Sequence, residues 1–569
     1  MSDPRDIRTG RPIPSEGYCD QPYVVRTDDG AWLCLLTTGA GQEGDARQHV
    51  VATRSRDQGR TWSPLVAIEP PGPPEASWVM PLKVPGGRVY AIYVYNGENR
   101  REVLSDHGPI RRVDTLGQYV FRYSDDGGRT WSSRRYEIPV RATQIDRDNP
   151  YGGRVRFFWG VGKPVLLEVA PGAEPRRPAA AIFGFAKVGR FGDGFMAASE
   201  GWFLRSDNIG SERDPERVRW ELLPEGEVGL RAPSGPVADE PNPTFLSDGS
   251  LYCTFRTTDG HNGAAYSRDG GRTWDGPGYA SYAPGGRLLR HPRAANFVRR
   301  FSNGKYVLWF HNHGGRDYRG RNPVWLCGGV EREGHIHWSQ PEILLYDDDP
   351  ATRMSYPDFI EEDGRYFVTE TQKTVARVHE VDATLLEGLW RQGERVPVTR
   401  DSARLESPGG GVAPRPALPA PDDAGGFSVE LWVRPGQTAP GEVLFTTRGA
   451  DGRGVEMAAG PEGTVRLLLN DGTRECGWTS DAGALTGAGL RHVVATVDGG
   501  PRLVTFVVDG QLQDGGDRRQ FGWGRFDRAL GDVSGSRAGA EVAAPVALIR
   551  VHGRYLRTSE AVGNWGAGL

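Results

Sequence analysis

A short pattern, Ser-x-Asp-x-Gly-x-Thr-Trp, occurs three times in the first half of the chain. Its Ser and Asp side chains can hydrogen-bond the backbone of a turn, its Gly can adopt a positive φ, and its Thr and Trp can begin the next strand. A β-rich run precedes each copy, so we expect each copy to connect two antiparallel strands. Because a catalytic loop would not be needed three times, we interpret the pattern as structural. The copies are Ser55–Trp62, Ser124–Trp131 and Ser267–Trp274, with Asp57, Asp126 and Asp269 at their third positions.

A self-similar unit separated by strand-rich sequence indicates radial repetition of small β-sheets. Two stretches resemble altered copies of the pattern, a longer one at Arg205–Trp220 and a shorter one at Glu331–Pro341. The fold class predicted from these features is all-β, with a propeller of six, or seven, blades. The motifs resemble the Asp boxes (BNR repeats) of the sialidase superfamily, and the resemblance covers roughly residues 15–390.

The composition of the chain changes after a short predicted helix at Ala383–Arg391, where a Pro- and Gly-rich stretch follows. The remaining sequence alternates like the strands of a two-sheet sandwich. Its runs FSVELWVRP, RHVVATVDG and VTFVVDGQL resemble the laminin-G or concanavalin-like lectin family, a jelly-roll β-sandwich. We therefore predict a propeller at 1–395, a connector at 396–426 and a sandwich at 427–569. The resemblance leaves two roles open for the sandwich, glycan binding or bracing of the propeller.

Charge and composition exclude several classes of partner. The formal net charge of −4 does not provide the broad basic field of a nucleic-acid-binding protein. No apolar run approaches the ~20 residues that span a bilayer, so no membrane partner is expected. The N-terminus as given has no apolar leader, which predicts a cytoplasmic protein, or a secreted one if a signal was removed. The five cysteines are scattered without a CxxC pair, so neither a disulfide framework nor a zinc site is expected. The oligomeric state is left open.

The organising stretch of the propeller, Asp239–Trp274, also carries the first candidate site residues. Glu240 precedes a strand, FLSDGSLYCTFR, that ends at Arg256, and this arrangement is similar to one in sialidases. Because a guanidinium matches a carboxylate with two parallel hydrogen bonds, Arg256 is predicted to bind the carboxylate of an acidic sugar. The alternative is an Arg–Glu pair that only joins two strands.

Tyr356 opens a later strand in a way that also resembles sialidases, and it could act as nucleophile or proton carrier if neighbours activate it. Two departures from that family are present. The Arg-Ile-Pro that supplies a first carboxylate-binding arginine is replaced by Asp20-Gln21-Pro22, and the acidic residue before the first Asp box is replaced by His49. A histidine titrates near neutral pH and can exchange protons, so His49 is predicted to be catalytic.

A second polar stretch, at 290–323, is richer in histidine and arginine than strand ends require. His311 and His313 alternate onto one strand face as a metal pair would, but no third ligand of equal quality is near, so no metal or other cofactor is indicated. We interpret the stretch as a substrate pocket with further anion contacts, and Lys163 as an additional candidate. The predicted binding residues are His291, Arg293, His311, His313, Arg316, Arg321 and Lys163, together with Arg256.

A histidine at this propeller position, with Tyr and Arg opposite, resembles propeller polysaccharide lyases and related rhamnosidases. The leading hypothesis is therefore an enzyme that cleaves a glycosidic bond at or next to an acidic sugar, a uronate, by β-elimination, with His49 and Tyr356 sharing the proton transfers. The first alternative is an exo-hydrolase, either sialidase-like with Tyr356 and Glu240 or rhamnosidase-like with His49. The second is a non-catalytic glycan-binding protein. In each case the partner is an oligosaccharide or polysaccharide, anionic in the first case.

Overall fold

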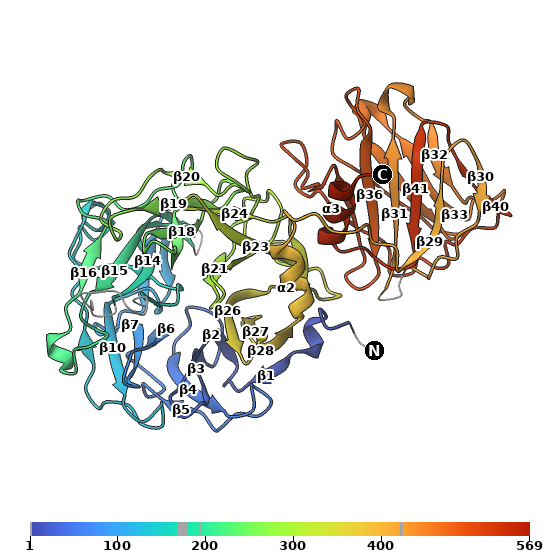
Figure 1. Cartoon of the computed structure of the whole chain (residues 1–569). Helices are drawn as coiled ribbons and strands as arrows, with labels where there is room; N and C mark the ends of the chain where they lie inside the picture. Colours follow the sequence, from blue (N-terminus) through green and yellow to red (C-terminus); the bar gives the residue numbers. More distant parts are fainter. Residues whose placement is uncertain (1–2, 168–179, 193–194, 422–424) are drawn as a thin grey trace.

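The protein is described here from a computed structural model, which covers residues 3–167, 180–192, 195–421 and 425–569. Within these residues, the part of the chain before residue 382 forms six antiparallel sheets arranged around a common axis (Figure 1). Inner strands of neighbouring sheets pack against one another, β2 against β6 and β26, and β17 against β21. Together with the sandwich that follows, this confirms the predicted all-β class.

The six sheets follow one another in chain order. The strands are β2 (Tyr18–Arg26), β3 (Trp32–Gly39), β4 (His49–Ser55) and β5 (Val66–Ala67); β6 (Ala76–Lys83), β7 (Val89–Tyr95), β10 (Gln118–Ser124) and β11 (Tyr136–Glu137); β12 (Phe158–Trp159), β13 (Val165–Leu166), β14 (Ala181–Phe191), β15 (Met196–Ser206) and β16 (Glu221–Leu223); β17 (Asp239–Phe245), β18 (Leu251–Arg256), β19 (Gly263–Ser267) and β20 (Gly278–Tyr279); β21 (Phe297–Arg300), β22 (Tyr306–Phe310), β23 (Val324–Arg332), β24 (His335–Trp338) and β25 (Glu342–Leu345); β26 (Ser355–Glu362), β27 (Arg365–Thr371), β28 (Ala376–Val381) and β1 (Arg11–Ile13).

The ring is closed by strands from both ends of the propeller sequence. β1, near the N-terminus, pairs antiparallel with β28, so that Arg11 lies opposite Val378. A short hairpin, β8 (Glu102–Ser105) with β9 (Gly108–Arg111), and the helix α1 (Gln144–Arg147) are insertions between sheets. The helix predicted at 383–391 is confirmed as α2 (Ala383–Trp390), which follows the last sheet.

The three Asp boxes form the turns expected of them. In the first, Ser55 Oγ donates to Asp57 Oδ1 at 2.8 Å, and the backbone N–H of Gly59 donates to Ser55 Oγ at 2.8 Å. Thr61 donates to the Asp57 carboxylate from both its backbone and its hydroxyl group. Asp126 and Asp269 accept the equivalent bonds in the other two copies. The side chains of the three aspartates therefore stabilise the turns.

The C-terminal part forms two stacked sheets and a helix, α3 (Thr558–Ala567). One buried core lies between the sheets. The sandwich begins earlier than the predicted boundary at 427, because two strands within the predicted connector pair into its sheets. The strands are β29 (Ala403–Ser407), β41 (Val546–His552), β31 (Phe427–Val433), β36 (Arg491–Asp498), β37 (Leu503–Val508), β38 (Gln511–Leu512) and β39 (Gly524–Arg525) in one sheet, and β30 (Gly411–Pro414), β40 (Gly539–Val542), β32 (Val443–Thr446), β33 (Gly454–Ala459), β34 (Val465–Asn470) and β35 (Glu475–Thr479) in the other.

The two parts share a continuous interface beside β23, β24 and α2 (Figure 1). Trp325 of the propeller and Leu512 and Trp523 of the sandwich belong to one buried apolar cluster. A buried ion pair joins Arg5 to Asp498, with N–O distances of 2.6 and 2.8 Å. In the described residues, no helix is long and apolar enough to cross a membrane.

Candidate functional site

Four inner strands carry the same irregularity near the end of the propeller opposite the Asp boxes. β2, β6, β17 and β26 each shift register against the neighbouring strand, and one residue in each shift has a positive φ. A left-handed conformation costs a non-glycine residue on the order of 1 kcal/mol or more, so such residues persist where the surrounding fold holds them, often at functional sites. The four residues are Gln21 (φ 55°), Trp78 (63°), Glu240 (52°) and Tyr356 (51°).

The last two of these residues meet near the propeller axis. Tyr356 Oη donates to Glu240 Oε1 at 2.9 Å, and Trp159 Nε1 donates to the same oxygen at 2.9 Å. Arg256 Nη1 lies 2.7 Å from that oxygen. Glu240 Oε2 is buried and has no hydrogen-bond partner among the described residues. We call Glu240, Tyr356, Trp159, Arg256 and Asp239 the axial cluster.

Burial and charge together set the protonation of the axial cluster. Burial raises the pKa of the Glu240 carboxyl group, and the Arg256 charge opposes that rise. Burial and the Glu240 charge raise the pKa of Tyr356, while Lys373 and Arg256 act in the opposite direction. The Tyr356 hydroxyl is therefore protonated at rest, and Glu240 is the group to which it can pass its proton.

Arg256 is held in place by a second carboxylate. Its Nε and Nη2 donate to the two oxygens of Asp239 at 2.6 and 3.0 Å. A guanidinium has five N–H groups, and the contacts with Asp239 and Glu240 engage three of them. The contacts with these two carboxylates leave two N–H groups over. The predicted Arg–Glu contact is therefore present, and it leaves Arg256 with free donor capacity.

A second charged group lies over Tyr356 and reaches solvent. Lys373 Nζ is 4.4 Å from the centroid of the Tyr356 ring, 2.5 Å from Asp20 and 2.8 Å from Glu43. Arg112 Nη2 donates to Glu43 at 3.0 Å. Although burial opposes it, Lys373 and Arg112 lower the pKa of Glu43 to about 2. The Lys373 and Glu43 side chains are each 21% exposed, so this layer faces solvent while the axial cluster lies beneath it.

Two further arginines approach the axial cluster from the fifth sheet. Arg321 Nη1 donates to Ser355 Oγ at 2.7 Å, next to Tyr356, and its Nη2 donates to the backbone oxygen of Arg293 at 3.3 Å. Arg293 Nη2 lies 3.9 Å from Asp239. Asn296, 4% exposed, has no partner for either amide atom among the described residues. These groups add positive charge and unused donors to the site.

Comparison with known proteins agrees with this architecture. A model of the BNR/Asp-box repeat matches residues 122–133, and a model of the Concanavalin A-like lectin/glucanases superfamily matches residues 409–560. The chain is an Asp-box propeller followed by a concanavalin A-like sandwich. The predicted resemblance is thereby confirmed for both parts. No curated protein matches the sequence.

Several solved structures are similar to the Asp-box propeller and its sandwich. A Trypanosoma rangeli sialidase in complex with 2,3-difluorosialic acid is 12% identical with a TM-score of 0.45, covering 98% of this chain and 96% of that chain. The intramolecular trans-sialidase of Ruminococcus gnavus is 13% identical with a TM-score of 0.46, covering 67% and 99%. A Hadza microbial sialidase is 16% identical with a TM-score of 0.43, covering 64% and 66%. Similarity at this level does not carry a function from one protein to another.

His49, predicted to be catalytic, lies away from the axial cluster. It starts β4 and pairs with Thr38, which pairs in turn with Cys19 of the inner strand. Its Nδ1 is 2.9 Å from the backbone oxygen of Glu69, and its Nε2 is 2.8 Å from the Glu16 carboxylate. With 2% exposure and both ring nitrogens engaged, His49 is placed to fix the loop before the first Asp box.

The three histidines predicted to bind substrate are buried and bonded to backbone oxygens of their own loops. Burial lowers their pKa values, to about 3 for His291 and about 4 for His313, so they are neutral near pH 7. Neutral, backbone-bonded imidazoles order a loop and do not attract an anion. The bonds run between His291 and Ala294, His311 and Pro323, and His313 and Gly320.

The two remaining predicted cations do not join the axial cluster either. Lys163 is buried and lies 2.7 Å from Asp358 and 2.6 Å from the backbone oxygen of Val24, where it links the third, first and sixth sheets. Burial lowers its pKa. Arg316 is exposed on the loop between β22 and β23. Of the predicted binding residues, Arg256, Arg293 and Arg321 are the ones gathered near Glu240 and Tyr356.

A repeated sequence signal could have located more of the site. Three of the four left-handed residues are preceded by Asp or Ser and followed by proline, in Asp20-Gln21-Pro22, Asp239-Glu240-Pro241 and Ser355-Tyr356-Pro357. Proline has no N–H to lose from a ladder, so it suits a bulge. This signal points to Asp20 and Asp239, which the sequence analysis did not assign to the site. Nothing comparable marks Trp159.

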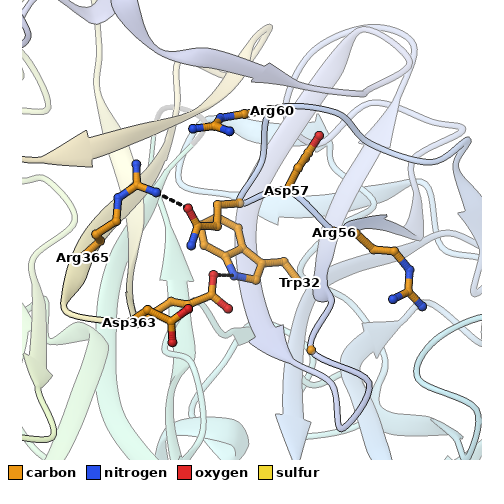
Figure 2. A pocket seen from close by; sticks show the side chains of 9 residues that line it. Trp32, Arg56, Asp57, Arg60, Asp363 and Arg365 are labelled. Carbon is orange, nitrogen blue, oxygen red and sulfur yellow. Dashed lines mark hydrogen bonds between the residues drawn. The ribbon is translucent and has the colours of Figure 1, made fainter.

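A hollow of about 240 Å³ lies at the Asp-box end, between the first and sixth sheets (Figure 2). Trp32 Nε1 donates to Glu362 at 3.0 Å, and Arg365 hydrogen-bonds Gln58 across it. Asp57, which also lines it, serves the Asp-box turn. The pairs Trp32–Glu362 and Arg365–Gln58 thus hold the two sheets together at this hollow. In the described ranges, no group of three His, Cys, Asp or Glu side chains is arranged to hold a metal ion.

Proposed function

We propose that this protein is a glycoside hydrolase that releases a terminal anionic sugar, with Tyr356 as nucleophile and Glu240 as its base. The 2.9 Å hydrogen bond from Tyr356 Oη to Glu240 Oε1 carries the proposal. A tyrosine hydroxyl becomes a competent nucleophile when a neighbouring base accepts its proton as it attacks. Glu240 is in contact with that proton and is oriented by Trp159 and Arg256.

The reaction would proceed in two displacements. In the first, Tyr356 Oη bonds to the anomeric carbon while its proton passes to Glu240 and the bond to the leaving oxygen breaks. The leaving oxygen takes a proton from water at the solvent-facing layer. In the second, water attacks the anomeric carbon, the tyrosine–sugar bond breaks, and Tyr356 recovers its proton from Glu240, while the proton lost by the attacking water returns to solvent. The net change is the addition of one water molecule.

Recognition of an anion is supported by the charges around Tyr356. Arg256 retains two N–H donors, and Arg321 and Arg293 approach from the fifth sheet. Lys373 lies over the tyrosine ring and 2.5 Å from Asp20, which belongs to the segment that replaces the first arginine motif of the sialidase pattern. Arg256 and Lys373 are held by carboxylates and Arg321 by the Ser355 hydroxyl before any ligand arrives, and such preorganised positive charge favours binding of an anion.

The hydrolase alternative of the sequence analysis is preferred here to β-elimination. Elimination would require a base and an acid near the sugar ring, and His49 and Tyr356 were expected to share these roles. Both nitrogens of His49 are engaged away from the axial cluster, whereas Tyr356 and Glu240 are in direct contact. The direct contact between Tyr356 and Glu240 supports the hydrolase, which needs a nucleophile next to its base, more than a lyase that uses His49.

The test uses the purified full-length chain with 4-methylumbelliferyl glycosides of sialic acid and of uronic acids, and with oligosaccharides ending in the same sugars. Hydrolysis yields products whose masses exceed that of the substrate by one water in sum. A 2,3-difluoro sugar, of the type in the T. rangeli sialidase complex described as a covalent intermediate, is expected to label Tyr356. Products that absorb in the ultraviolet as unsaturated uronates, without added water, would overturn the proposal.

A further inference from the structure

The loop between β22 and β23, residues 311–323, carries one of the site arginines and has no strand partner of its own. Arg321, near its end, reaches Ser355 Oγ beside Tyr356 at 2.7 Å. Tyr318, at its centre, stacks on Phe195 with ring centroids 5.1 Å apart. The conformation of this loop therefore determines the position of the Arg321 guanidinium relative to Tyr356.

A segment of the sandwich, residues 512–525, contacts this loop at both ends; we call it the clamp segment. At the start of the loop, Gly314 N donates to the backbone oxygen of Gln520 at 2.9 Å, and Trp523 Nε1 lies 3.4 Å from the oxygen of Asn312. At its end, Arg525 Nη2 donates to the oxygen of Asn322 at 3.1 Å. Three backbone groups of the loop thus find their partners in the other domain.

Apolar contact reinforces these bonds. The ring of Phe521 packs on the neutral imidazole of His313 with centroids 4.6 Å apart, and Trp523 packs on Phe521 at 4.7 Å. Trp523 is 6% exposed and belongs to the core shared by both domains. The loop therefore packs against Phe521, which in turn packs against Trp523 of the hydrophobic core shared by the two domains.

The clamp segment is itself tied to the propeller on the other side. Arg290 Nη1 donates to the backbone oxygens of Asp514 and Arg519 at 2.6 and 2.7 Å. Arg287 donates to the oxygen of Leu512 at 2.8 Å. The segment is thus also bonded to the connection between β20 and β21, so it has contacts with the propeller besides those with the loop.

We propose that the clamp segment positions Arg321, so that the concanavalin A-like domain is a structural part of the site rather than an independent glycan-binding module. The functional part of this inference rests on the proposed hydrolase. A displacement of about 1 Å of a substrate-positioning group can cost on the order of 100-fold in rate. Phe521, Trp523 and Arg525 are positioning residues, because they act on a ligand only through the loop.

The test compares full-length wild type with Phe521→Ala, with Arg525→Met and with the control Val412→Ala, whose side chain is 75% exposed on the other sheet of the sandwich. Hydrogen exchange of the peptide spanning 311–323 is measured beside that spanning 55–62, an Asp box at the far end. We expect at least tenfold faster exchange at 311–323 in the two clamp variants and no change at 55–62 or in the control. Unchanged exchange at 311–323 in both clamp variants would overturn the clamp.

A second arm measures catalysis with the 4-methylumbelliferyl substrate. The clamp variants are expected to raise KM by about tenfold or more, with the pH profile of kcat unchanged because Tyr356 and Glu240 are untouched. Phe521→Leu, which keeps an apolar contact, is expected to recover part of the loss. Faster exchange with an unaltered KM would refute the positioning of Arg321. If wild type cleaves none of the substrates, the proposed function fails, and the exchange arm still decides whether the clamp holds the loop.

Discussion

Tyr356 and Glu240 come from different sheets of the propeller, each in a left-handed bulge, and are joined by a 2.9 Å hydrogen bond at the axis. The strain in both backbones is sustained by the same fold that brings the side chains together. In the proposed hydrolase, this bond joins the nucleophile to its base.

Replacing Tyr356 by phenylalanine removes the nucleophile and keeps the ring. We expect kcat/KM on a glycoside substrate to fall by at least 1,000-fold, because hydrolysis then lacks its covalent step. The thermal midpoint should change little, and Tyr136→Phe, on the outer strand β11, serves as the control. Activity of the Tyr356 variant within tenfold of wild type would show that another group attacks the sugar. Steady-state kinetics with a 4-methylumbelliferyl glycoside measures the effect.

Arg256→Lys keeps a positive charge but loses the paired donors. We expect KM for an anionic substrate to rise about 10- to 100-fold, because a lysine cannot hold Asp239 bidentately and still offer two donors to a ligand. Arg256→Leu should also lower the free energy of unfolding by about 3–5 kcal/mol, since it leaves Asp239 and Glu240 buried without their partner. Urea denaturation measures the second effect. Arg205→Lys, which loses a partly exposed pair with Asp207 and a hydrogen bond to the Gly270 backbone oxygen, is the matched control. Equal weakening of neutral and anionic ligands would argue against carboxylate binding.

His49→Gln tests the residue that sequence reasoning placed in catalysis. Glutamine can replace part of the hydrogen bonding to Glu16 and to the Glu69 backbone, so we expect kcat to stay within about threefold of wild type. General acid–base groups contribute about 100- to 10,000-fold. A fall in kcat of that size, in a variant whose circular dichroism shows that it is folded, would indicate that His49 is catalytic. It would also support the elimination mechanism.

Because several histidines are buried near the fifth sheet, we expect the stability of the fold to decrease at acid pH. Burial lowers the pKa of His313 to about 4, against about 6.5 in an unfolded chain, so the unfolded state binds more protons between these values. The contribution of neutral His313 to stability is present above pH 6.5 and is lost as the pH falls toward 4. It should amount to about 2 kcal/mol between pH 7 and pH 5. The charged neighbours of His313, Arg290 and Asp317, oppose each other in this effect.

Denaturant unfolding of wild type and His313→Gln at pH 7 and pH 5 measures the prediction. Between pH 7 and pH 5, the free energy of unfolding should fall by about 2 kcal/mol less in the variant than in wild type. Identical losses in the two proteins would show that His313 does not titrate on unfolding.

Much of the architecture could be predicted from local sequence. In each Asp box the bonded groups lie two to four positions apart in the sequence. Asp57, Asp126 and Asp269 can therefore be recognised from the spacing of the motif. Alternation of apolar residues identified the sandwich strands, and Asp382, which caps α2, precedes a short helix that was also expected. The domain boundary was less well predicted, because β29 and β30 lie in a Pro- and Gly-rich stretch and are strands only through pairing with β41 and β40.

The site was predicted in part. Glu240, Tyr356 and Arg256 were found through a resemblance, and the geometry brings them together. His49 was expected to act on substrate because histidine titrates near neutral pH, and His313 because it lies in an unusually polar stretch. Burial and bonds to backbone oxygens give both a structural place. Asp239 and Glu43 were not assigned to the site, because a carboxylate acquires its role from charged partners that can lie far away in the chain.

The sequence by itself determined the repeating turns, the β class and the two-part organisation, since each depends on residues within one strand or one turn of each other. Only the tertiary structure decided which polar residues share a site. Closure of six sheets around an axis brings Tyr356 to Glu240 from 116 residues away, and packing of the sandwich brings Phe521 to His313 from 208 residues away. Long-range contacts of this kind are set by the summed packing of the whole chain, and no local pattern encodes them.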